Sequence, residues 1–369
     1  MRVFFYVQHL LGLGHLKRAA TLARAMRAGG LEVTLASGGM PVADIPVDVQ
    51  LAPMSAGDMT FKSLIDHTGR AVDDGWKRRR AAMLIDVWRA ARADALVVEL
   101  FPFGRRQMRF ELLPLLEDAQ RMPKRPLVVC SVRDLIQPKP GRDAETVALV
   151  ERYFDRVLVH GDPRVVPFGR TFALAPRLES RLHYTGYVVD DAPGASGARG
   201  EVLVSAGGGA VGKRLLETAI LAREHTLLRA ATWRVLAGVN RSDVDLRALE
   251  RKARPGVVIE RSREDFQALL GAAALSISQA GYNTVAETLK ARVRALFVPF
   301  AGEGESEQTL RAGLLAERGA ATMLAESDLT IENLAAAVNR AAKAPQPSPD
   351  IVDLDGARRS AELMKEWLS

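Results

Sequence analysis

Residues 275–308 combine small, hydroxyl, amide and acidic side chains in an order that suits the binding of a charged ligand. A short apolar run, 275–277, leads into a small-residue turn that ends at Gly281. The pattern after the turn predicts a helix that opens at Asn283 or Thr284. The free N–H groups and the dipole at the start of such a helix favour negative charge. A diphosphate fits this site best, so the segment points to nucleotide chemistry.

Glu287 follows Thr284 by three residues, and this spacing allows two interpretations. In a capping box, a carboxylate at the third helical position bonds back to the backbone of the residue that caps the helix. The functional alternative is a carboxylate that accepts hydrogen bonds from both hydroxyls of a ribose, one turn below the phosphate site. The sequence alone leaves both interpretations open.

A second buried run, 295–298, stops at Pro299 and leads into an acidic, glycine-containing loop. This loop is expected at the carboxyl end of a strand, where parallel sheets bind ligands. Glu307 and Gln308 in the loop can hydrogen-bond the hydroxyls of a sugar, or they are two solvated loop residues. Their position just beyond a buried strand favours the sugar-binding interpretation.

The first strand of the chain is followed by a glycine-containing turn that ends in His15. Gly12 and Gly14 let the backbone approach a ligand closely, and the start of the following helix keeps His15 neutral and able to accept a proton. The alternative is that His15 caps the turn without chemistry. The turn is no dinucleotide fingerprint, because Lys17 replaces the third glycine and the second strand ends at Ser37 without an acid for the ribose.

Glu99 ends another predicted strand and is followed by two aromatic residues and the pair Arg105 and Arg106. A carboxylate and paired guanidinium groups at the carboxyl end of a strand can hold an acceptor that carries an anionic group. Glu99 is also a second candidate for the general base. The alternative is an aromatic anchor with two surface arginines.

A third glycine-containing turn holds Gly207, Gly208 and Gly209, after a predicted strand at 201–205 and before a helix. These glycines expose N–H groups to a phosphate, although close packing of a helix on a strand also selects glycine. The turn is not a Walker motif, because no Gly-Lys-Ser/Thr follows to hold phosphate and magnesium.

These residues must be positioned by apolar runs that alternate with helical patterns along nearly the whole chain. Strands are predicted at 3–7, 33–37, 95–99, 127–132, 156–159, 201–205, 232–236, 257–260, 275–278, 295–298 and 321–324, and helices include 16–28, 212–223 and 266–273. Continuous apolar strands that alternate with helices predict parallel sheets covered on both faces. A Gly/Pro-rich linker, 190–200, divides the chain into α/β domains at 1–189 and 201–345. A last helix at 350–369 is expected to pack back towards the first domain.

Composition limits the class of protein further. The chain has 369 residues, 48% of them apolar, and a net charge of +7. No apolar run reaches the roughly 18 residues of a membrane span, and the single Cys130 fits a cytoplasmic location. The basic run 77–80 opens an amphipathic stretch that either packs on the core or lies on anionic lipid at the inner face of the membrane. No metal is indicated, since the spacings of zinc ligands are absent.

Together these motifs resemble the GT-B glycosyltransferases, and family 28 in particular, over most of the chain. Gly14 and His15 match the Gly-His that ends the family's first glycine-rich turn, and Gly207–Gly209 match its second. Gly281, Thr284 and Glu287 match the nucleotide-sugar motif, and Glu307 with Gln308 match the pair that grips the donor sugar. The segment with Arg263 and Phe266 matches the one that covers the base. The family's usual serine before Gly281 is Ala280 here, and its doubled glutamine begins with Glu307.

The resemblance implies two Rossmann-like parallel-sheet domains that face each other across a cleft. It implies a metal-independent, inverting transfer of a hexosyl or N-acetylhexosaminyl group from a nucleoside-diphosphate sugar, with UDP favoured, and no cofactor. We expect His15 to be the base, and the Gly207–Gly209 turn and the helix end at Asn283 and Thr284 to stabilise the leaving diphosphate. The acceptor is unidentified, anionic or lipid-linked, and nucleic acid is not expected.

Two other functions stay open at this point. A nucleotide-sugar 2-epimerase of the same fold would convert a UDP-sugar without any acceptor. A basic protein that binds nucleic acid or a membrane surface would use the charge of +7, but it would also need stacking aromatic residues, which the sequence does not show.

Overall fold

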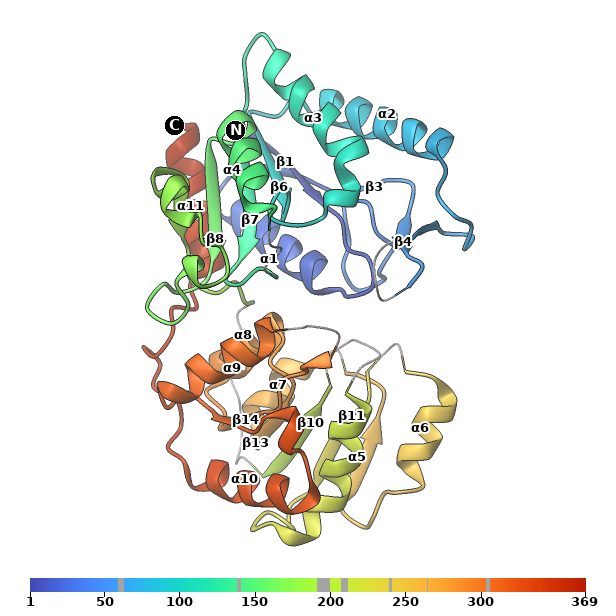
Figure 1. Cartoon of the computed structure of the whole chain (residues 1–369), viewed down its shortest axis with the longest axis vertical. Coiled ribbons are helices and arrows are strands. Elements are labelled where there is room, and N and C mark those ends of the chain that lie inside the picture. Colours follow the sequence, from blue (N-terminus) through green and yellow to red (C-terminus); the bar gives the residue numbers. More distant parts are fainter. Residues whose placement is uncertain are drawn as a thin grey trace. The chain divides into compact units, whose positions relative to one another are not determined.

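The computed structural model describes residues 1–58, 63–137, 141–190, 200–206, 212–238, 241–263, 265–302 and 306–369. The chain forms two compact units (Figure 1). The N-terminal unit consists of Met1–Val188 together with Asp355–Ser369, and the C-terminal unit of Val189–Leu354. Residues 191–199, most of the predicted linker, lie outside the described residues. Each unit is built around one parallel sheet.

The N-terminal unit contains a seven-stranded sheet in the order β3-β2-β1-β6-β7-β8-β9. Its strands are β1 (Arg2–Val7), β2 (Glu32–Ser37), β3 (Val49–Gln50), β6 (Ala95–Glu99), β7 (Leu127–Arg133), β8 (Arg156–His160) and β9 (Leu182–Tyr184). Every neighbouring pair is parallel. A separate antiparallel pair, β4 (Met54–Ala56) and β5 (Leu64–Asp66), was not predicted, nor were β3 and β9. These strands have only two or three residues, too few for an apolar run to reveal them.

Alternating residues of the strands pack on opposite faces of this sheet. Phe4 and Tyr6 of β1 belong to one buried cluster with α2 (Asp74–Ala91), α3 (Arg109–Arg121) and α4 (Asp143–Tyr153). Val3 and Phe5 belong to the cluster that includes α1 (Gly14–Ala28) and α11 (Gly356–Leu368). Because both faces are covered, the strands must be apolar throughout, which is why the sequence reveals them.

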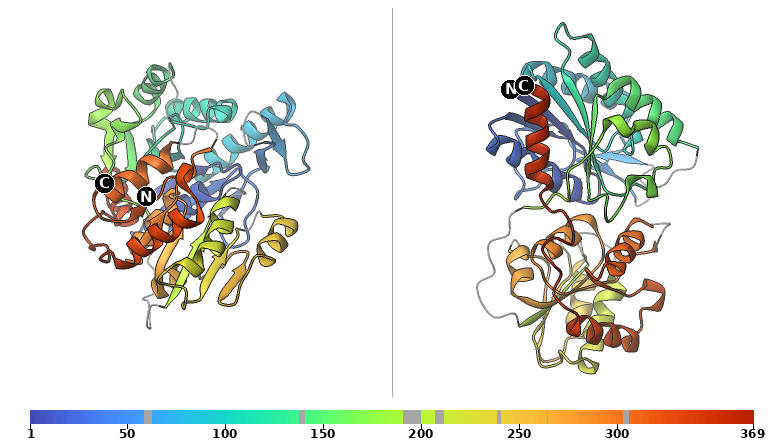
Figure 2. Two further views of the ribbon diagram at one scale, coloured as in Figure 1. Left: turned by 60° about the horizontal axis from the view of Figure 1, so that its bottom comes forward. Right: turned by 90° about the vertical axis from the view of Figure 1, so that its left-hand side faces the viewer.

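The last helix, α11, is shorter than predicted and packs on the N-terminal unit (Figure 2). It begins at Gly356 and not near residue 350. The Gly356 amide donates to the carbonyl of Tyr187, 3.1 Å away, and a Cβ at Gly356 would lie 2.4 Å from the carbonyl oxygen of Gly186. The chain therefore re-enters the N-terminal unit through a contact too close for a side chain, and the helix starts there.

The C-terminal unit contains a six-stranded parallel sheet in the order β12-β11-β10-β13-β14-β15. Its strands are β10 (Glu201–Ser205), β11 (Trp233–Leu236), β12 (Val257–Glu260), β13 (Ala273–Ser278), β14 (Ala295–Phe297) and β15 (Thr322–Met323). Its helices are α5 (Lys213–Ala222), α6 (Asp243–Glu250), α7 (Phe266–Ala272), α8 (Tyr282–Lys290), α9 (Glu307–Glu317) and α10 (Ile331–Lys343). The predicted parallel α/β sheets are confirmed in both halves.

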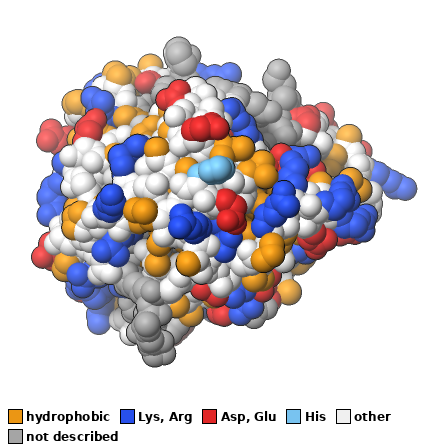
Figure 3. All heavy atoms as spheres, turned by 90° about the horizontal axis from the view of Figure 1, so that it is seen from below, with side chains coloured by type: hydrophobic (Ala, Val, Ile, Leu, Met, Phe, Trp, Pro, Cys, Tyr) orange, Lys and Arg blue, Asp and Glu red, His pale blue; other side chains and the backbone are white. Residues whose placement is uncertain are grey.

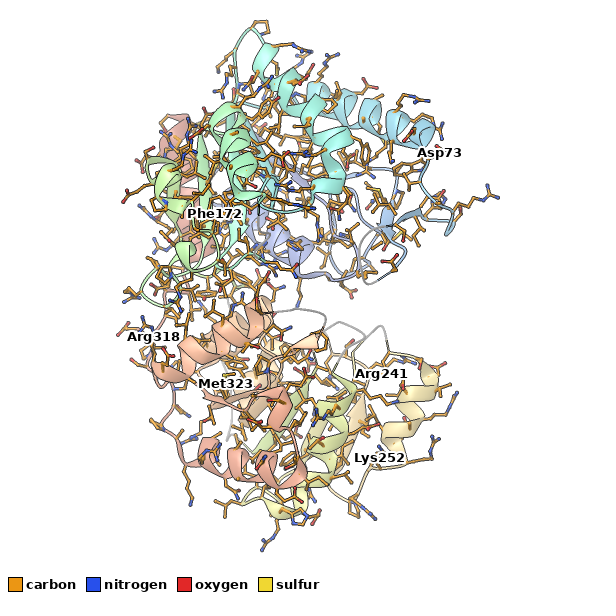
Figure 4. The ribbon with its side chains drawn as sticks, viewed as in Figure 1. Asp73, Phe172, Arg241, Lys252, Arg318 and Met323 are labelled. Carbon is orange, nitrogen blue, oxygen red and sulfur yellow. The ribbon has the colours of Figure 1, made fainter. Side chains whose placement is uncertain are left out.

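The basic run 77–80 lies in α2, whose first turn is capped by Asp73: its carboxylate accepts from the Trp76 amide at 2.6 Å (Figure 4). Leu84 and Trp88 of this helix are buried in the core, so the core-packing interpretation holds for its apolar face. Among the described residues, no helix has the length and apolar content to cross a lipid bilayer. On the described part of the face in Figure 3, basic and acidic side chains are interspersed, as on an ordinary mixed-charge surface.

Candidate functional site

Both sheets have the strand order in which the winding of the chain reverses beside the first strand. The reversal lies between β1 and β6 in the N-terminal unit and between β10 and β13 in the C-terminal unit. Open α/β sheets bind ligands outside the carboxyl ends of the strands at such a reversal. The predicted site residues follow these strands: His15 and Glu99 in the first unit, and the turn with Gly281 in the second.

In the N-terminal unit, His15 and Glu99 form a direct pair. The Nδ1 atom of His15, in the first turn of α1, lies 3.0 Å from Oε1 of Glu99, the last residue of β6. His15 is not the N-cap of α1, because that residue is Leu13, whose side chain makes no capping hydrogen bond. The side chain of His15 contacts Glu99 instead, so its role as a helix cap is not supported.

Glu99 is buried and is held by two further residues. Arg18, three residues after His15 on α1, forms an ion pair with Oε1. The hydroxyl of Ser131 donates to Oε2 at 2.5 Å. Burial alone would raise the pKa of Glu99, but the charge of Arg18 and the hydrogen bonds from His15 and Ser131 lower it to about 2. Glu99 is thus a carboxylate at neutral pH whose two oxygens are already engaged by His15, Arg18 and Ser131, so His15 is the better candidate for the base.

The environment of His15 keeps its ring neutral. Burial, then the charge of Arg105, lower the pKa of His15 to about 3, and the hydrogen bond and charge of Glu99 only partly oppose them. A carboxylate can only accept, so the 3.0 Å contact with Glu99 calls for a proton on Nδ1 of His15, whereas Nη2 of Arg18, which can only donate, lies further from Nδ1 at 3.3 Å. We assign the proton to Nδ1 because the contact with Glu99 is the shorter one. Nε2 then carries the lone pair, as a general base requires.

The pair Arg105 and Arg106 is divided between two roles. Arg105 stays with the site: its Nε donates to the carbonyl of Gln8 at 3.0 Å, and burial, then the nearby charge of Arg133, lower its pKa to about 10. Arg106 instead pairs with Glu145 of α4 at 2.5 Å. For Arg106 the prediction of an acceptor-side contact is not supported, because a surface carboxylate already engages it.

The aromatic residues after Glu99 belong to the core. The ring of Phe103 lies 5.3 Å from that of Phe168 and 5.2 Å from that of Phe172, both edge to face. This corresponds to the aromatic-anchor alternative. The anchor fixes the loop that carries Arg105.

In the C-terminal unit, α8 begins earlier than predicted. Its first residue is Tyr282 and its N-cap is Gly281, so Asn283 and Thr284 lie inside the first turn. The capping-box interpretation of Glu287 is therefore wrong, because Thr284 does not cap the helix. The N-cap residue Gly281 has no side chain to cap α8, and among the described residues no heavy atom apart from its chain neighbours lies within 4 Å of where its Cβ would be.

Three predicted donor residues share one face of α8. Asn283, Thr284 and Glu287 are all half-buried, whereas Tyr282, Val285, Ala286, Thr288 and Leu289 are buried. Residues three and four apart are neighbours on a helix surface, so these three side chains lie together beside the N-terminus of the helix. The structure thus brings Gly281, Asn283, Thr284 and Glu287 into one place.

Glu307 and Gln308 are not loop residues, as had been predicted, but the first residues of α9. Glu307 is buried. The side-chain oxygen of Gln308 accepts from the amide of Ala280 at 3.0 Å and from that of Phe300 at 3.2 Å. The buried Arg311 donates to the carbonyl of Ala280 at 2.9 Å. The first turn of α9 therefore holds the turn before α8 through both backbone groups of Ala280, a role that the sequence did not reveal.

The remaining residues predicted to bind the donor belong to other segments of the C-terminal unit than the turn before α8. Arg263 is engaged by Asp265 through two hydrogen bonds of 2.8 Å. Phe266 begins α7, which packs beside α8. Gly207, Gly208 and Gly209 lie outside the described residues. Within the described ranges, no group of three or more His, Cys, Asp and Glu side chains is placed to hold a metal ion.

Three residues of the two sites were not predicted from the sequence: Arg18, Ser131 and Arg311. Arg18 lies on the same helix face as His15, three residues on, and this spacing was a usable signal. Ser131 is a polar residue inside an apolar strand, which also marks it. Arg311 gave no signal, because its role depends on the packing of α9 against the turn.

Residues 208–352 match the family described as "Glycosyltransferase family 28 C-terminal domain". A curated relative from Alcanivorax borkumensis is 37% identical over 109 residues, which are 28% of this chain and 30% of the relative. Its name is UDP-N-acetylglucosamine–N-acetylmuramyl-(pentapeptide) pyrophosphoryl-undecaprenol N-acetylglucosamine transferase. The chain thus spans less than a third of the length of this relative.

Solved structures resemble the chain over nearly its full length. MurG from Acinetobacter baumannii has a TM-score of 0.60 at 16% identity, covering 99% of this chain and 100% of that one. The glycosyltransferase VinC in complex with dTDP has a TM-score of 0.61 at 15% identity, covering 100% and 95%. At these identities the likeness establishes the fold. Residues 208–352 of the chain thus form a family 28 C-terminal domain within the C-terminal unit, and the chain as a whole has the GT-B glycosyltransferase fold.

Proposed function

We propose that this protein transfers a sugar from a nucleoside-diphosphate sugar, preferably a UDP-sugar, to a hydroxyl of an acceptor. The observation that carries the proposal is that the family 28 domain, residues 208–352, nearly coincides with the compact C-terminal unit. It includes the turn and the start of α8 at the reversal of the sheet. UDP is favoured because the relative described above is named for a UDP-sugar.

In this proposal the donor lies along α8. The diphosphate accepts hydrogen bonds from amides at the start of the helix. The sequence predicts Gly207–Gly209, which lie outside the described residues, as a second source of N–H groups. Glu287, one turn further along, accepts from the ribose hydroxyls. Thr284 and Asn283, on the same face, contribute polar contacts between the two.

The transfer step is a single displacement at the anomeric carbon. The acceptor oxygen forms a bond to that carbon while the bond from the carbon to the β-phosphate oxygen breaks, and its electron pair leaves with the nucleoside diphosphate. The acceptor proton passes to Nε2 of His15, and Glu99 stabilises the resulting imidazolium. A direct displacement inverts the anomeric centre. Stabilisation of the leaving diphosphate by amide groups takes the place of a metal ion.

The acceptor is proposed to carry an anionic group, as a lipid-linked phosphate would. Three guanidinium groups, those of Arg18, Arg105 and Arg133, act on the site against the one carboxylate of Glu99. Burial, then the charges of Arg105 and Arg18, lower the pKa of His15. An anion bound beside Arg105 would offset these charges and raise that pKa towards the working pH.

Calorimetric titration of the full chain with UDP, dTDP, GDP and their sugars tests the donor site. We expect the tightest binding for a UDP-sugar, unchanged by EDTA. The absence of binding to every diphosphate would contradict the proposal. Steep salt dependence of binding to DNA, in the absence of nucleotide binding, would favour a nucleic-acid protein. Conversion of UDP-N-acetylglucosamine alone, without acceptor, would identify an epimerase.

Replacing Glu287 with Ala is expected to weaken the binding of UDP roughly 10- to 100-fold, because a hydrogen bond to a charged group contributes about 1.5–3 kcal/mol. The measurement is calorimetric titration of UDP, accompanied by thermal unfolding. Glu317→Ala removes an exposed carboxylate from the end of α9 and serves as the matched control. Unchanged affinity in Glu287→Ala, with a lowered Tm, would assign Glu287 a structural role only.

A further inference from the structure

A second histidine, His160, is connected to Glu99 through a buried chain of hydrogen bonds. Its Nε2 lies 2.9 Å from the hydroxyl oxygen of Ser131, which in turn lies 2.5 Å from Oε2 of Glu99. Its Nδ1 lies 2.9 Å from the hydroxyl oxygen of Thr185. Each of these side chains is at most 2% exposed. The chain runs from Thr185, after β9, across β8 and β7 to the end of β6, where His15 approaches Glu99 from α1.

The chemistry of the end groups fixes the direction of every hydrogen bond in this chain. Glu99 is ionised and can only accept, so Ser131 must donate to it. The Ser131 oxygen then accepts from His160, which requires a proton on Nε2. Burial, then the charge of Arg18, keep the pKa of His160 at about 3, so the ring is neutral and its Nδ1 can only accept, with Thr185 as the donor. The Thr185 hydroxyl also lies 3.0 Å from the carbonyl oxygen of Gly186, which is a competing acceptor, whereas Ser131 and His160 both donate towards Glu99.

We propose that His160, with Ser131 and Thr185, is a positioning residue for the base His15, and this rests on the proposed function. This chain of hydrogen bonds holds the Glu99 carboxylate ionised and in one orientation, with Oε1 towards Nδ1 of His15. That orientation keeps the His15 proton on Nδ1 and leaves Nε2 free to take the acceptor proton. No proton moves along the chain, and His160 touches neither substrate.

Two facts about this chain of hydrogen bonds favour a positioning role for His160 over simple packing. Both ring nitrogens of His160 and the Ser131 hydroxyl have partners at hydrogen-bond distance, although apolar residues would fill a buried strand position at lower desolvation cost. The hydrogen-bond chain also ends at the carboxylate that contacts His15, and Arg18 pairs with the same oxygen, Oε1, from a position 3.3 Å from Nδ1 of His15. A network in which every member is satisfied specifies a single arrangement.

The test uses the ring nitrogens of the six histidines of the full chain, observed by nitrogen–proton correlation in 15N-labelled protein. His15→Gln and His160→Gln assign the two signals. In the wild type we expect the Nδ1–H tautomer at His15 and the Nε2–H tautomer at His160. Ser131→Ala is expected to give a mixture of tautomers at His15, and Thr185→Val, which keeps the side-chain volume, a mixture at His160. Ser360→Ala, which removes another buried hydroxyl of the same unit, should change neither.

With UDP-N-acetylglucosamine and cell extract as the transfer assay, Ser131→Ala and Thr185→Val are expected to lower kcat about tenfold at unchanged donor KM, as the loss of one buried hydrogen bond implies. Thr185→Ser should restore it. A His15 tautomer that stays pure Nδ1–H in both variants overturns the inference, even if transfer is observed. If Ser131→Ala fails to fold, the comparison of Thr185→Val with the restoring variant Thr185→Ser decides the test. If the variants show mixed histidine tautomers but the protein binds no nucleotide, the coupling between the hydrogen-bond chain and His15 is supported. Only the proposed function is then contradicted.

Discussion

Replacing His15 with Ala is expected to lower the rate of sugar transfer by roughly 10²- to 10⁴-fold, the usual contribution of a positioned general base. Its affinity for the nucleoside diphosphate is expected to stay unchanged. The first expectation follows from the pair with Glu99, whose 3.0 Å contact leaves Nε2 of His15 as the proton acceptor. The second follows because the proposed donor residues belong to the other compact unit.

The measurement is the steady-state rate of UDP release in the presence of acceptor, combined with titration of UDP. His67→Ala removes an exposed histidine from the same unit and should leave both quantities unchanged. His15→Gln keeps a side-chain amide near Glu99 but no basic nitrogen, so it should be as inactive as His15→Ala. Full activity in His15→Gln would show that this residue only maintains the fold.

The pH dependence of the wild type gives an independent check of the same residue. Since the pKa of His15 is lowered to about 3, the ring is neutral in the free enzyme over the range in which most enzymes work. kcat/KM reports groups of the free enzyme, so its acid limb from His15 should lie below about pH 5. An anionic acceptor beside Arg105 would raise this pKa, so the acid limb of kcat should lie at higher pH. An acid limb of kcat/KM centred near 6.5 would contradict the buried environment of His15.

The same pKa values determine the direction in which the stability of the fold changes with pH. His9, His15 and His160 have pKa values lowered to about 4, 3 and 3 by burial, so the unfolded chain binds more protons than the folded chain at mildly acid pH. Their contribution is complete above the unfolded value of 6.5 and is lost as the pH falls towards the folded values.

The central strands of both sheets could be predicted because they are buried on two faces and are therefore continuous apolar runs. Predicted 95–99 and 201–205 agree with β6 and β10 to the residue, and so does 257–260 with β12, an edge strand that is only half-buried but still an apolar run. The first turn of α8 was placed one or two residues late, since Gly281 is both a turn residue and an N-cap and the sequence does not distinguish the two. Short edge strands of two or three residues, such as β3, form because they pair with a neighbouring strand, and their own residues show no recognisable strand pattern.

The site was predictable where a polar residue ends an apolar run, as His15 and Glu99 show. It was not predictable where function depends on which polar groups meet. Arg105 and Arg106 are adjacent in sequence, but only Arg105 stays near Glu99, because the left-handed backbone at Arg105, φ 56°, turns the chain between them. Gln308 holds the backbone of Ala280, which lies 28 residues away, and no local pattern reveals such a contact.

Removing one partner of the buried ion pair between Arg80 and Glu111 is expected to lower the free energy of unfolding by about 3–5 kcal/mol. Nε of Arg80 lies 3.0 Å from Oε2 of Glu111, and both side chains are completely buried. The hydroxyl of Tyr6 donates to the other carboxylate oxygen at 2.6 Å. Arg80→Ala would leave the carboxylate without its countercharge in a site that water does not reach, and this desolvation is the cost.

Urea unfolding followed by circular dichroism measures the effect. Arg121→Ala, which breaks the exposed pair with Glu117, is the control and should change the free energy by less than about 1 kcal/mol. The double substitution Arg80→Met, Glu111→Leu removes both charges together, so it should recover most of the loss. A double variant as unstable as the single one would show that the hydrogen bonds of Arg80, rather than its charge, stabilise the unit.

The same pair also connects stability to the site, which makes activity a second readout. Arg80 donates to the side-chain oxygen of Gln8 at 3.2 Å, and the carbonyl of Gln8 accepts from Arg105. Gly38 has to be a glycine here, because a Cβ would lie 1.9 Å from Nη2 of Arg80. The apolar double variant keeps the fold but releases Gln8, so the carboxyl end of β1 loses one of its supports. We therefore expect the double variant to recover stability without recovering the full rate of transfer. A double variant that recovers both would show that Gln8 keeps its position without Arg80.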